Sequence, residues 1–286
     1  MDRRPNRLII AKYSAPKDLS LVSAAELLGE GRRAMAAQII DFAVRRVITV
    51  SRPASASRRS GFTLAVARDP RTEGVEELDV LNAVFGAYPV RVGQSIEIRP
   101  RQNRAIGERL RAPHRRIAAY LITRGLAREK SLLTKLLRPW RKQPVVPTEA
   151  AQSLVDHLWG IHDYVKLAER DRYAMLQSPE GAPRSALDVL QLSEKLLPYA
   201  VLFGLEKQWA AQLDIQVGEV RRELPDFVDA ADLVMLGANS LDAAAQVADL
   251  VDALPALADL VDLGDVLEGV GAVFGGIGEF LGSLSP

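Results

Sequence analysis

Charge is divided unevenly along this 286-residue chain. Residues 1–142 contain 29 Lys and Arg against 13 Asp and Glu, a net charge of +16, whereas residues 143–286 have a net charge of −15. No Lys or Arg follows Arg222, although acidic residues continue as far as Glu279. A chain divided in this way either attracts an anionic partner with its first half or brings its two halves into contact.

The composition limits the chemistry and the compartment. The chain has no cysteine, which excludes disulfides, thiolate metal sites and cysteine nucleophiles. Residues 1–10 lack the apolar core of a secretory signal. The longest weakly charged run, residues 269–282, is shorter than the ~20 apolar residues that cross a bilayer. We therefore expect a cytoplasmic protein without transmembrane spans, either free or peripheral at the inner membrane face.

Residues 1–70 follow the order helix, helix, strand, turn, strand. Ser20 has the side chain of an N-cap and Gly29 ends the first predicted helix. The next helix carries one apolar stripe. Residues 47–50 then predict a short strand, and residues 62–66 predict a second strand with alternating apolar positions. Helices followed by such a hairpin indicate a winged-helix-like unit in which the hairpin is the wing.

Residues 71–137 predict a second winged-helix-like unit of the same plan. A helix should end at Gly86, a strand follows at residues 95–98, and Pro113 is expected to interrupt the next helix. Residues 138–147 contain three prolines and are the best candidate for a linker.

Residues 148–222 predict a helical bundle. Thr148 is expected to cap a long helix that extends through Leu176, and a further helix should span residues 185–203. Residues 223–286 form an acidic tail rich in Leu, Asp and Gly, with helical spacing of its aspartates. The chain as a whole is therefore predicted to be mainly α with small β-hairpins, an α+β fold.

Two stretches of the bundle resemble a known family. They are residues 163–182, which begin DYVKLAERDR, and residues 194–210, which begin EKLLPYAVLFGLE. Both resemble the cytoplasmic domain of the YciQ-like predicted membrane proteins, a bacterial family of unknown function. Weaker similarity extends over most of residues 7–213. The resemblance implies a bacterial cytoplasmic module and provides no catalytic residues. Family members usually carry transmembrane helices, whereas residues 138–147 are too short to span a bilayer.

No pattern of residues points to catalysis. His157 and His162 are five positions apart, which places them on different faces of a helix. The sequence contains no G-x-S-x-G elbow, and its glycine pairs follow no predicted strand. Neighbouring carboxylates such as Glu76 and Glu77 are expected to lie on solvated, salt-bridging faces. We therefore expect no enzymatic activity, no cofactor and no metal.

Arginines of the first half form a candidate surface for nucleic acid or for anionic lipid. A solvated basic face without a ligand is the alternative explanation. The arginines are Arg45, Arg46, Arg52, Arg58, Arg59, Arg101, Arg104, Arg109, Arg115 and Arg116.

The acidic tail has three interpretations: it folds back onto the basic half, docks in a partner's groove, or is disordered. Its candidate contact residues are Leu250, Leu254, Leu257, Leu260, Leu263, Phe274, Ile277 and Phe280. Our functional hypothesis is a non-enzymatic interaction or scaffold module that binds a protein partner or itself as a homo-oligomer. The alternative is a DNA-binding transcriptional regulator.

Overall fold

The computed structural model describes residues 9, 11–12, 14–16, 19–51, 62–98, 104–129, 145–166, 186–206, 208–209, 213 and 216. This part of the chain is mostly helical with two small antiparallel sheets, which confirms the predicted α+β class. The helices are α1 (Leu21–Leu28), α2 (Gly31–Val44), α3 (Val75–Phe85), α4 (Arg104–Thr123), α6 (Gln152–Lys166) and α8 (Ala186–Leu202). The strands are β1 (Ile48–Ser51), β2 (Phe62–Val66), β3 (Ser95–Ile98), β4 (Ala127–Glu129) and β5 (Val145–Pro147).

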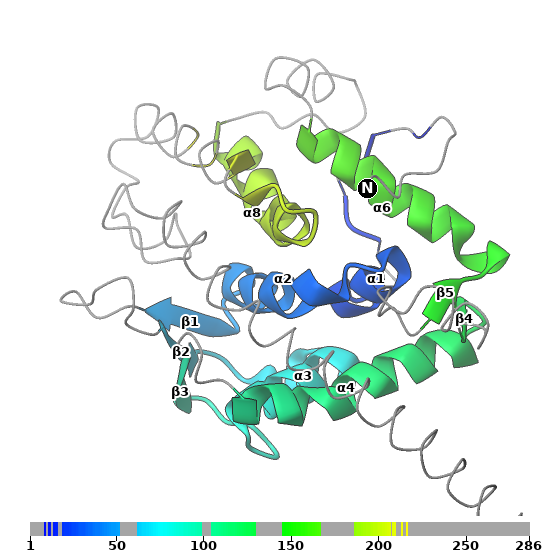
Figure 1. Cartoon of the computed structure of the whole chain (residues 1–286). Coiled ribbons are helices and arrows are strands. Elements are labelled where there is room, and N and C mark those ends of the chain that lie inside the picture. Colours follow the sequence, from blue (N-terminus) through cyan, green and yellow to red (C-terminus); the bar gives the residue numbers. More distant parts are fainter. Residues whose placement is uncertain are drawn as a thin grey trace, which may run out of the picture.

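Figure 1 shows three layers of helices. α1 and α2 form the middle layer, α6 and α8 lie on one side of it, and α3 and α4 lie on the other. The buried apolar side chains form one cluster that extends from Leu19 to Trp209. Elements that the sequence assigned to separate units therefore share one hydrophobic core. None of the described helices combines the length and the apolar character needed to cross a membrane.

The ends of α1 and α3 follow from local sequence. The Ser20 side chain accepts a hydrogen bond of 3.2 Å from the backbone N–H of Ser23, which satisfies a donor in the first turn of α1. Gly29 and Gly86 end the two helices in the left-handed conformation, with φ of 70° and 69°. These predicted boundaries are confirmed.

The larger sheet has the strand order β1-β2-β3. β1 and β2 pair antiparallel, with Ile48 opposite Val66, as the predicted hairpin requires. Phe62, Leu64 and Val66 of β2 point into the core. β3 pairs with β2 rather than forming a second hairpin, so a strand that we assigned to the second unit completes the sheet of the first.

The expectation that Pro113 interrupts its helix is wrong, because α4 runs through this residue. Proline within a helix costs about 3 kcal/mol relative to alanine, since it removes one backbone hydrogen bond. On either side of the proline, Leu110, Ile117 and Leu121 are buried in the core. Tertiary packing of this face outweighs the local preference.

Part of the predicted linker forms a strand. Residues 145–147 are β5, which pairs antiparallel with β4 so that Ala127 lies opposite Pro147. Pro147 is the last residue of this strand, and the missing N–H is tolerated because β5 is an edge strand of a two-stranded sheet. Thr148 does not cap a helix with its side chain, and its hydroxyl instead donates a hydrogen bond to the carbonyl of Gly125. A short 3-10 helix, Glu149–Ala151, leads into α6.

Candidate functional site

A groove of about 770 Å³ opens where the start of α3 faces the second half of α4. Leu19 and Ile117 line it and are buried, with exposed fractions of 8% and 2%. Val75 and Tyr120 also line it but are exposed, at 81% and 44%. The groove therefore combines a buried apolar floor with an apolar rim that reaches into solvent.

The local structure explains why the two rim residues project. Val75 is the first residue of α3, next to Gly74, whose N–H donates a hydrogen bond of 3.3 Å to the Glu77 carboxylate. The Tyr120 ring is held from one side by Arg124, whose guanidinium carbon lies 5.6 Å from the ring centroid. Arg124 also donates a 3.3 Å hydrogen bond to the Tyr120 hydroxyl. Both rim side chains therefore project from helices, Val75 from the first position of α3 and Tyr120 from the second half of α4.

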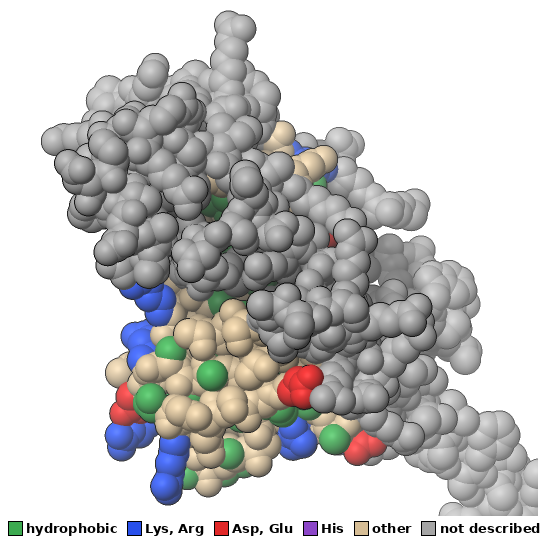
Figure 2. All heavy atoms as spheres, turned by 90° about the vertical axis from the view of Figure 1, so that its left-hand side faces the viewer, with side chains coloured by type: hydrophobic (Ala, Val, Ile, Leu, Met, Phe, Trp, Pro, Cys, Tyr) green, Lys and Arg blue, Asp and Glu red, His purple; other side chains and the backbone are tan. Residues whose placement is uncertain are grey.

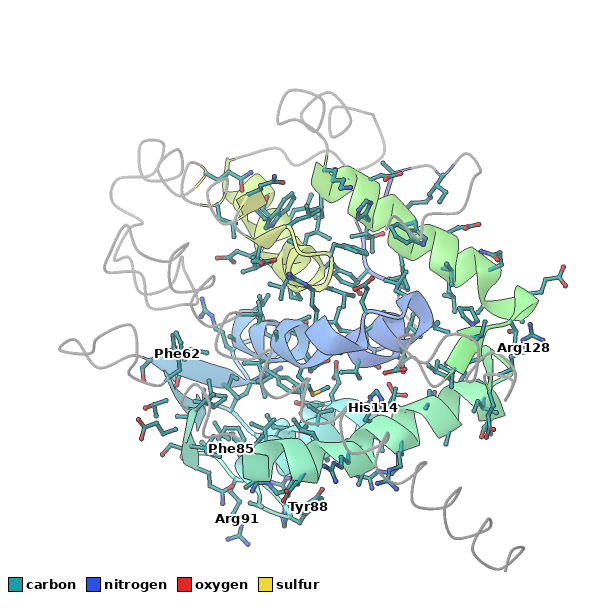
Figure 3. All side chains as sticks on the ribbon, in the orientation of Figure 1. Phe62, Phe85, Tyr88, Arg91, His114 and Arg128 are labelled. Atoms are coloured by element: carbon teal, nitrogen blue, oxygen red, sulfur yellow. The ribbon has the colours of Figure 1, made fainter. Side chains whose placement is uncertain are left out.

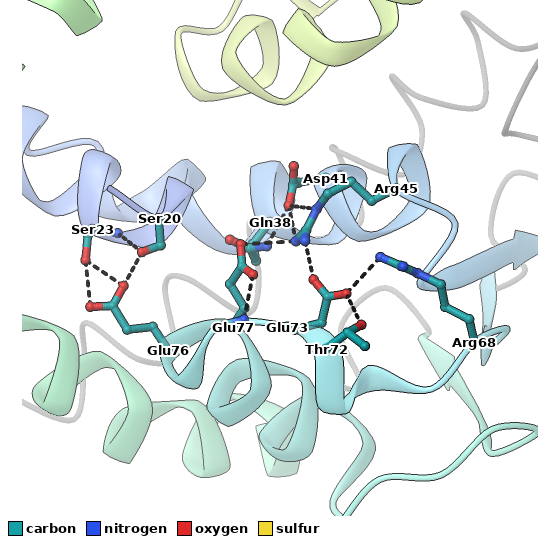
Figure 4. A network of polar contacts seen from close by, with 11 residues as sticks. Ser20, Ser23, Gln38, Asp41, Arg45, Arg68, Thr72, Glu73, Glu76 and Glu77 are labelled. Carbon is teal, nitrogen blue, oxygen red and sulfur yellow. Dashed lines mark hydrogen bonds and ion pairs between the residues drawn. The ribbon is translucent and has the colours of Figure 1, made fainter. Parts of the chain in front are cut away.

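Glu76 joins this groove to the first turn of α1. Its carboxylate accepts hydrogen bonds from the Ser23 hydroxyl at 2.9 and 3.0 Å and from the hydroxyl of Ser20 (Figure 4). The N-terminus of a helix carries a partial positive charge, which favours an anion at this position. The contacts fix a negative charge in the wall of the groove.

Glu77 connects the groove to an ionic network between α2 and α3 (Figure 4). Arg45 pairs with Asp41 at 2.6 Å, with Glu77 at 3.1 Å and also with Glu73. Arg68 forms a second ion pair with Glu73, at 2.8 Å. Three carboxylates thus share two guanidinium groups, which leaves negative charge in excess.

Burial and neighbouring charges shift the pKa values of two of these carboxyl groups. Burial raises the pKa of Glu77, the Arg45 charge opposes the increase, and the neighbouring Asp41 adds to it. Burial likewise raises the pKa of Asp41 against the opposing effect of Arg45. At the mouth of the groove, Asp79 forms a separate 2.7 Å ion pair with Arg116.

Three arginines of the predicted anion-binding surface contact groups of the chain itself. Arg45 lies in the network above, and Arg116 pairs with Asp79. Arg109 donates hydrogen bonds to the carbonyls of Ala83 at 2.7 Å and Val84 at 3.0 Å, near the end of α3.

The other seven arginines of that surface fall into two groups. Arg46 and Arg115 are exposed. Arg52, Arg58, Arg59, Arg101 and the side chain of Arg104 lie outside the described residues. Figure 2 shows the sheet end of the molecule, where basic side chains are interspersed with acidic and apolar ones. Anion binding by this surface stays a prediction.

The histidines occupy three different environments. Nδ1 of His114 lies 3.1 Å from the Glu26 carboxylate, between α4 and α1 (Figure 3). Nε2 of His157 lies 2.6 Å from the carbonyl oxygen of Ser14. His162 packs edge-on against Trp159, with ring centroids 5.0 Å apart. The described residues contain no group of three or more His, Asp or Glu arranged to hold a metal ion.

Sequence reasoning missed the groove and placed Glu76 and Glu77 on a solvated face. The groove is built from residues 19–20, the start of α3 and the second half of α4, so no local pattern marks it. The candidate contact residues of the acidic tail, from Leu250 to Phe280, all lie outside the described residues.

No protein-family model, curated protein or solved structure matches the chain. Of the two stretches that carry the YciQ-like resemblance, residues 163–166 end α6, and residues 194–202 form the second half of α8. In α8 they provide core side chains, among them Leu196, Leu197 and Val201.

Proposed function

We propose that the chain is a non-enzymatic protein-interaction module whose partner docks in the groove between α3 and α4. The observation that supports this most directly is the exposure of Val75 and Tyr120 above a buried apolar floor. Covering apolar surface is favourable by roughly 25 cal/mol per Å². Contiguous apolar surface bordered by polar groups is typical of interaction sites.

The hydrogen bonds around the groove support the same proposal, because they hold its walls in place before a partner arrives. Glu76 ties the start of α3 to Ser20 and Ser23 of α1, and Glu77 ties it to Arg45 of α2. Binding to such a prearranged surface requires little ordering of the protein, so more of the contact energy appears as affinity.

We also propose a fold type, a cellular location and a family for this module. Two helices followed by the β1–β2 hairpin, with β3 as a third strand, favour a winged-helix-like arrangement. We place the protein in the bacterial cytoplasm as a YciQ-like module on the basis of the sequence resemblance. Self-association, through the groove or through the tail, is one form that docking can take.

A photocrosslinking amino acid substituted at Val75 tests the proposal in the full chain. Val92 is the matched control, because it is also an exposed valine, at 56%, but lies outside the groove. We expect adducts with a protein from position 75 and few from position 92. An adduct of twice the chain mass would identify a second copy. Equal labelling from both positions, or none from position 75, would contradict docking in the groove.

DNA binding is a second candidate, favoured by the composition of the segment that joins β1 and β2. This segment, residues 52–61, contains Arg52, Arg58 and Arg59 and no acidic residue. In a winged-helix-like unit it would be the tip of the wing. Gel shifts with random duplex DNA at two salt concentrations test the idea. Binding that weakens steeply with salt supports it, and no shift at low salt removes it.

A further inference from the structure

We infer that the occupant of the α3–α4 groove is an apolar protein segment that carries basic residues. This inference rests on the proposed docking function and adds the chemistry of the partner. The groove offers its apolar surface and its negative charge side by side, at Val75 and at the adjoining Glu76 and Glu77.

The charge of the lining is the first argument. Glu76, Glu77 and Asp79 line the groove, whereas Arg116 is the cation among its described lining residues. Arg116 is already paired with Asp79 at 2.7 Å. Arg124 lies over the Tyr120 ring at the rim but is not among the lining residues. Within the described lining, the unbalanced charge is therefore carried by Glu76 and Glu77.

Neither glutamate is fully neutralised by its own contacts. Glu76 is held by the neutral hydroxyls of Ser20 and Ser23, which stabilise its charge without cancelling it. Glu77 pairs with Arg45, but the same guanidinium also forms ion pairs with Asp41 and Glu73, so its positive charge is shared among three carboxylates. A basic side chain from a partner would add a cation where the network lacks one.

The apolar part of the groove decides which kind of cationic partner fits. An apolar segment that filled the groove would contact the exposed Val75 and Tyr120 and the floor formed by Leu19 and Ile117. Apolar anchors in such pockets usually supply most of the binding energy, and charges then set orientation and specificity. A hydrophilic basic chain would leave this surface exposed to water.

The same charges argue against the chain's own acidic tail as the occupant. Residues 223–286 contain acidic residues and no Lys or Arg, so the tail would add negative charge beside Glu76 and Glu77. Like charges brought together in a partly desolvated groove oppose binding.

Fluorescence anisotropy with the full chain and three synthetic peptides of equal length tests the inference. The probes are an amphipathic Leu/Lys peptide, a Leu/Glu peptide with the same spacing, and a Ser/Lys peptide without apolar residues. We expect the Leu/Lys peptide to bind and the other two to bind at least about tenfold more weakly. Equal binding of the Leu/Glu or the Ser/Lys peptide would overturn the inference.

Two pairs of variants locate the binding. Val75→Ser and Tyr120→Ser should each weaken binding of the Leu/Lys peptide by about five- to tenfold. Val92→Ser and Tyr88→Ser are the matched controls, since these exposed residues lie outside the groove lining. Tyr88 and Arg91 belong to the loop after α3, and Figure 3 shows them at the lower edge of the molecule, away from Arg128 at the right. Equal loss in the controls would place the peptide elsewhere.

One variant is expected to strengthen binding, which a loss of folding would not do. Arg116→Gln removes the cation from the groove, so the Leu/Lys peptide should bind about two- to fivefold more tightly. Arg91→Gln, an exposed arginine outside the groove lining, should change nothing. Unchanged or weaker binding to the Arg116 variant would contradict the charge argument. If position 75 crosslinks a partner while the Leu/Lys peptide fails to bind, docking stands and the inferred chemistry fails.

Discussion

Arg33 of α2 and Glu206, just beyond the end of α8, form a 2.9 Å ion pair between Nη1 and Oε2. The Glu206 side chain is only 8% exposed, and the same Arg33 nitrogen donates a 3.0 Å hydrogen bond to the carbonyl of Val201. The contact lies where Gly204, with φ of 74°, ends α8. This ion pair adds a polar link to the shared core between the N-terminal helices and a helix that the sequence assigns to a separate bundle.

We expect Arg33→Ala to lower the free energy of unfolding by about 2 kcal/mol. The variant leaves the carboxylate of Glu206 nearly buried without its cation, a situation that costs more than the pair itself contributes. The loss is smaller than for a fully buried pair because the Arg33 side chain is 38% exposed. Urea unfolding followed by circular dichroism measures the change.

Arg71→Ala is the control for this measurement. Arg71 pairs with Asp69 at 2.7 Å, but the two side chains are 80% and 47% exposed. Pairs in this setting contribute little, because water and salt screen them. If both arginine variants lost the same stability, the contact at the end of α8 would have no special role.

Elements whose ends depend on neighbouring residues were predictable from the sequence. Ser20 and Gly29 mark α1, Gly86 marks the end of α3, and the alternation from Phe62 to Val66 marks β2. In each case the signal is a side chain or a conformational preference that acts within one or two turns of the chain. The class of the fold follows from these elements.

Features that depend on distant residues were not predictable. The pairing of β3 with β2 joins strands about 30 residues apart and changes no local pattern. Arg45, Arg109 and Arg116 look alike in the sequence, yet the first enters a carboxylate network, the second binds backbone carbonyls and the third pairs with Asp79. The groove escaped prediction for the same reason, because three separate segments form it.

Ser20→Ala should destabilise the protein by about 1–2 kcal/mol. The hydroxyl both accepts from the Ser23 N–H and donates to Glu76, so its loss removes an N-cap and one of the contacts that fix the groove wall. Ser95→Ala is the control, since Ser95 is exposed on β3. Thermal and urea unfolding measure both variants. A change in the control as large as that in Ser20→Ala would rule out this explanation.

The free energy of unfolding should decrease as the pH rises towards and through the folded-state pKa of Glu194. Burial raises the pKa of this carboxyl group from 4.5 to about 7, against the opposing charge of Arg46. A carboxyl group with a raised folded-state pKa favours the folded state while it is protonated, so its contribution is complete below pH 4.5 and is lost as the pH passes about 7.

We expect the loss between these pH values to be about 1–2 kcal/mol. The full shift would correspond to about 3–4 kcal/mol, at about 1.4 kcal/mol per pKa unit, and partial exposure of Glu194 reduces it. Glu194→Gln should remove this part of the pH dependence. Urea unfolding at a series of pH values compares the two proteins. Parallel curves would show that Glu194 does not titrate in this range.

Arg109→Gln distinguishes a structural arginine from an anion-binding one. Arg109 donates through Nε to Ala83 and through Nη2 to Val84, and it lies against Gly86 at the end of α3. A shorter neutral side chain leaves these carbonyls without their donor, so the free energy of unfolding should fall by about 1–2 kcal/mol. Retention of duplex DNA on a gel at low salt should stay as in the unaltered chain. Arg91→Gln, exposed in the loop after α3, should change neither property. If Arg109→Gln instead weakened DNA retention and left stability intact, Arg109 would belong to an anion-binding surface after all.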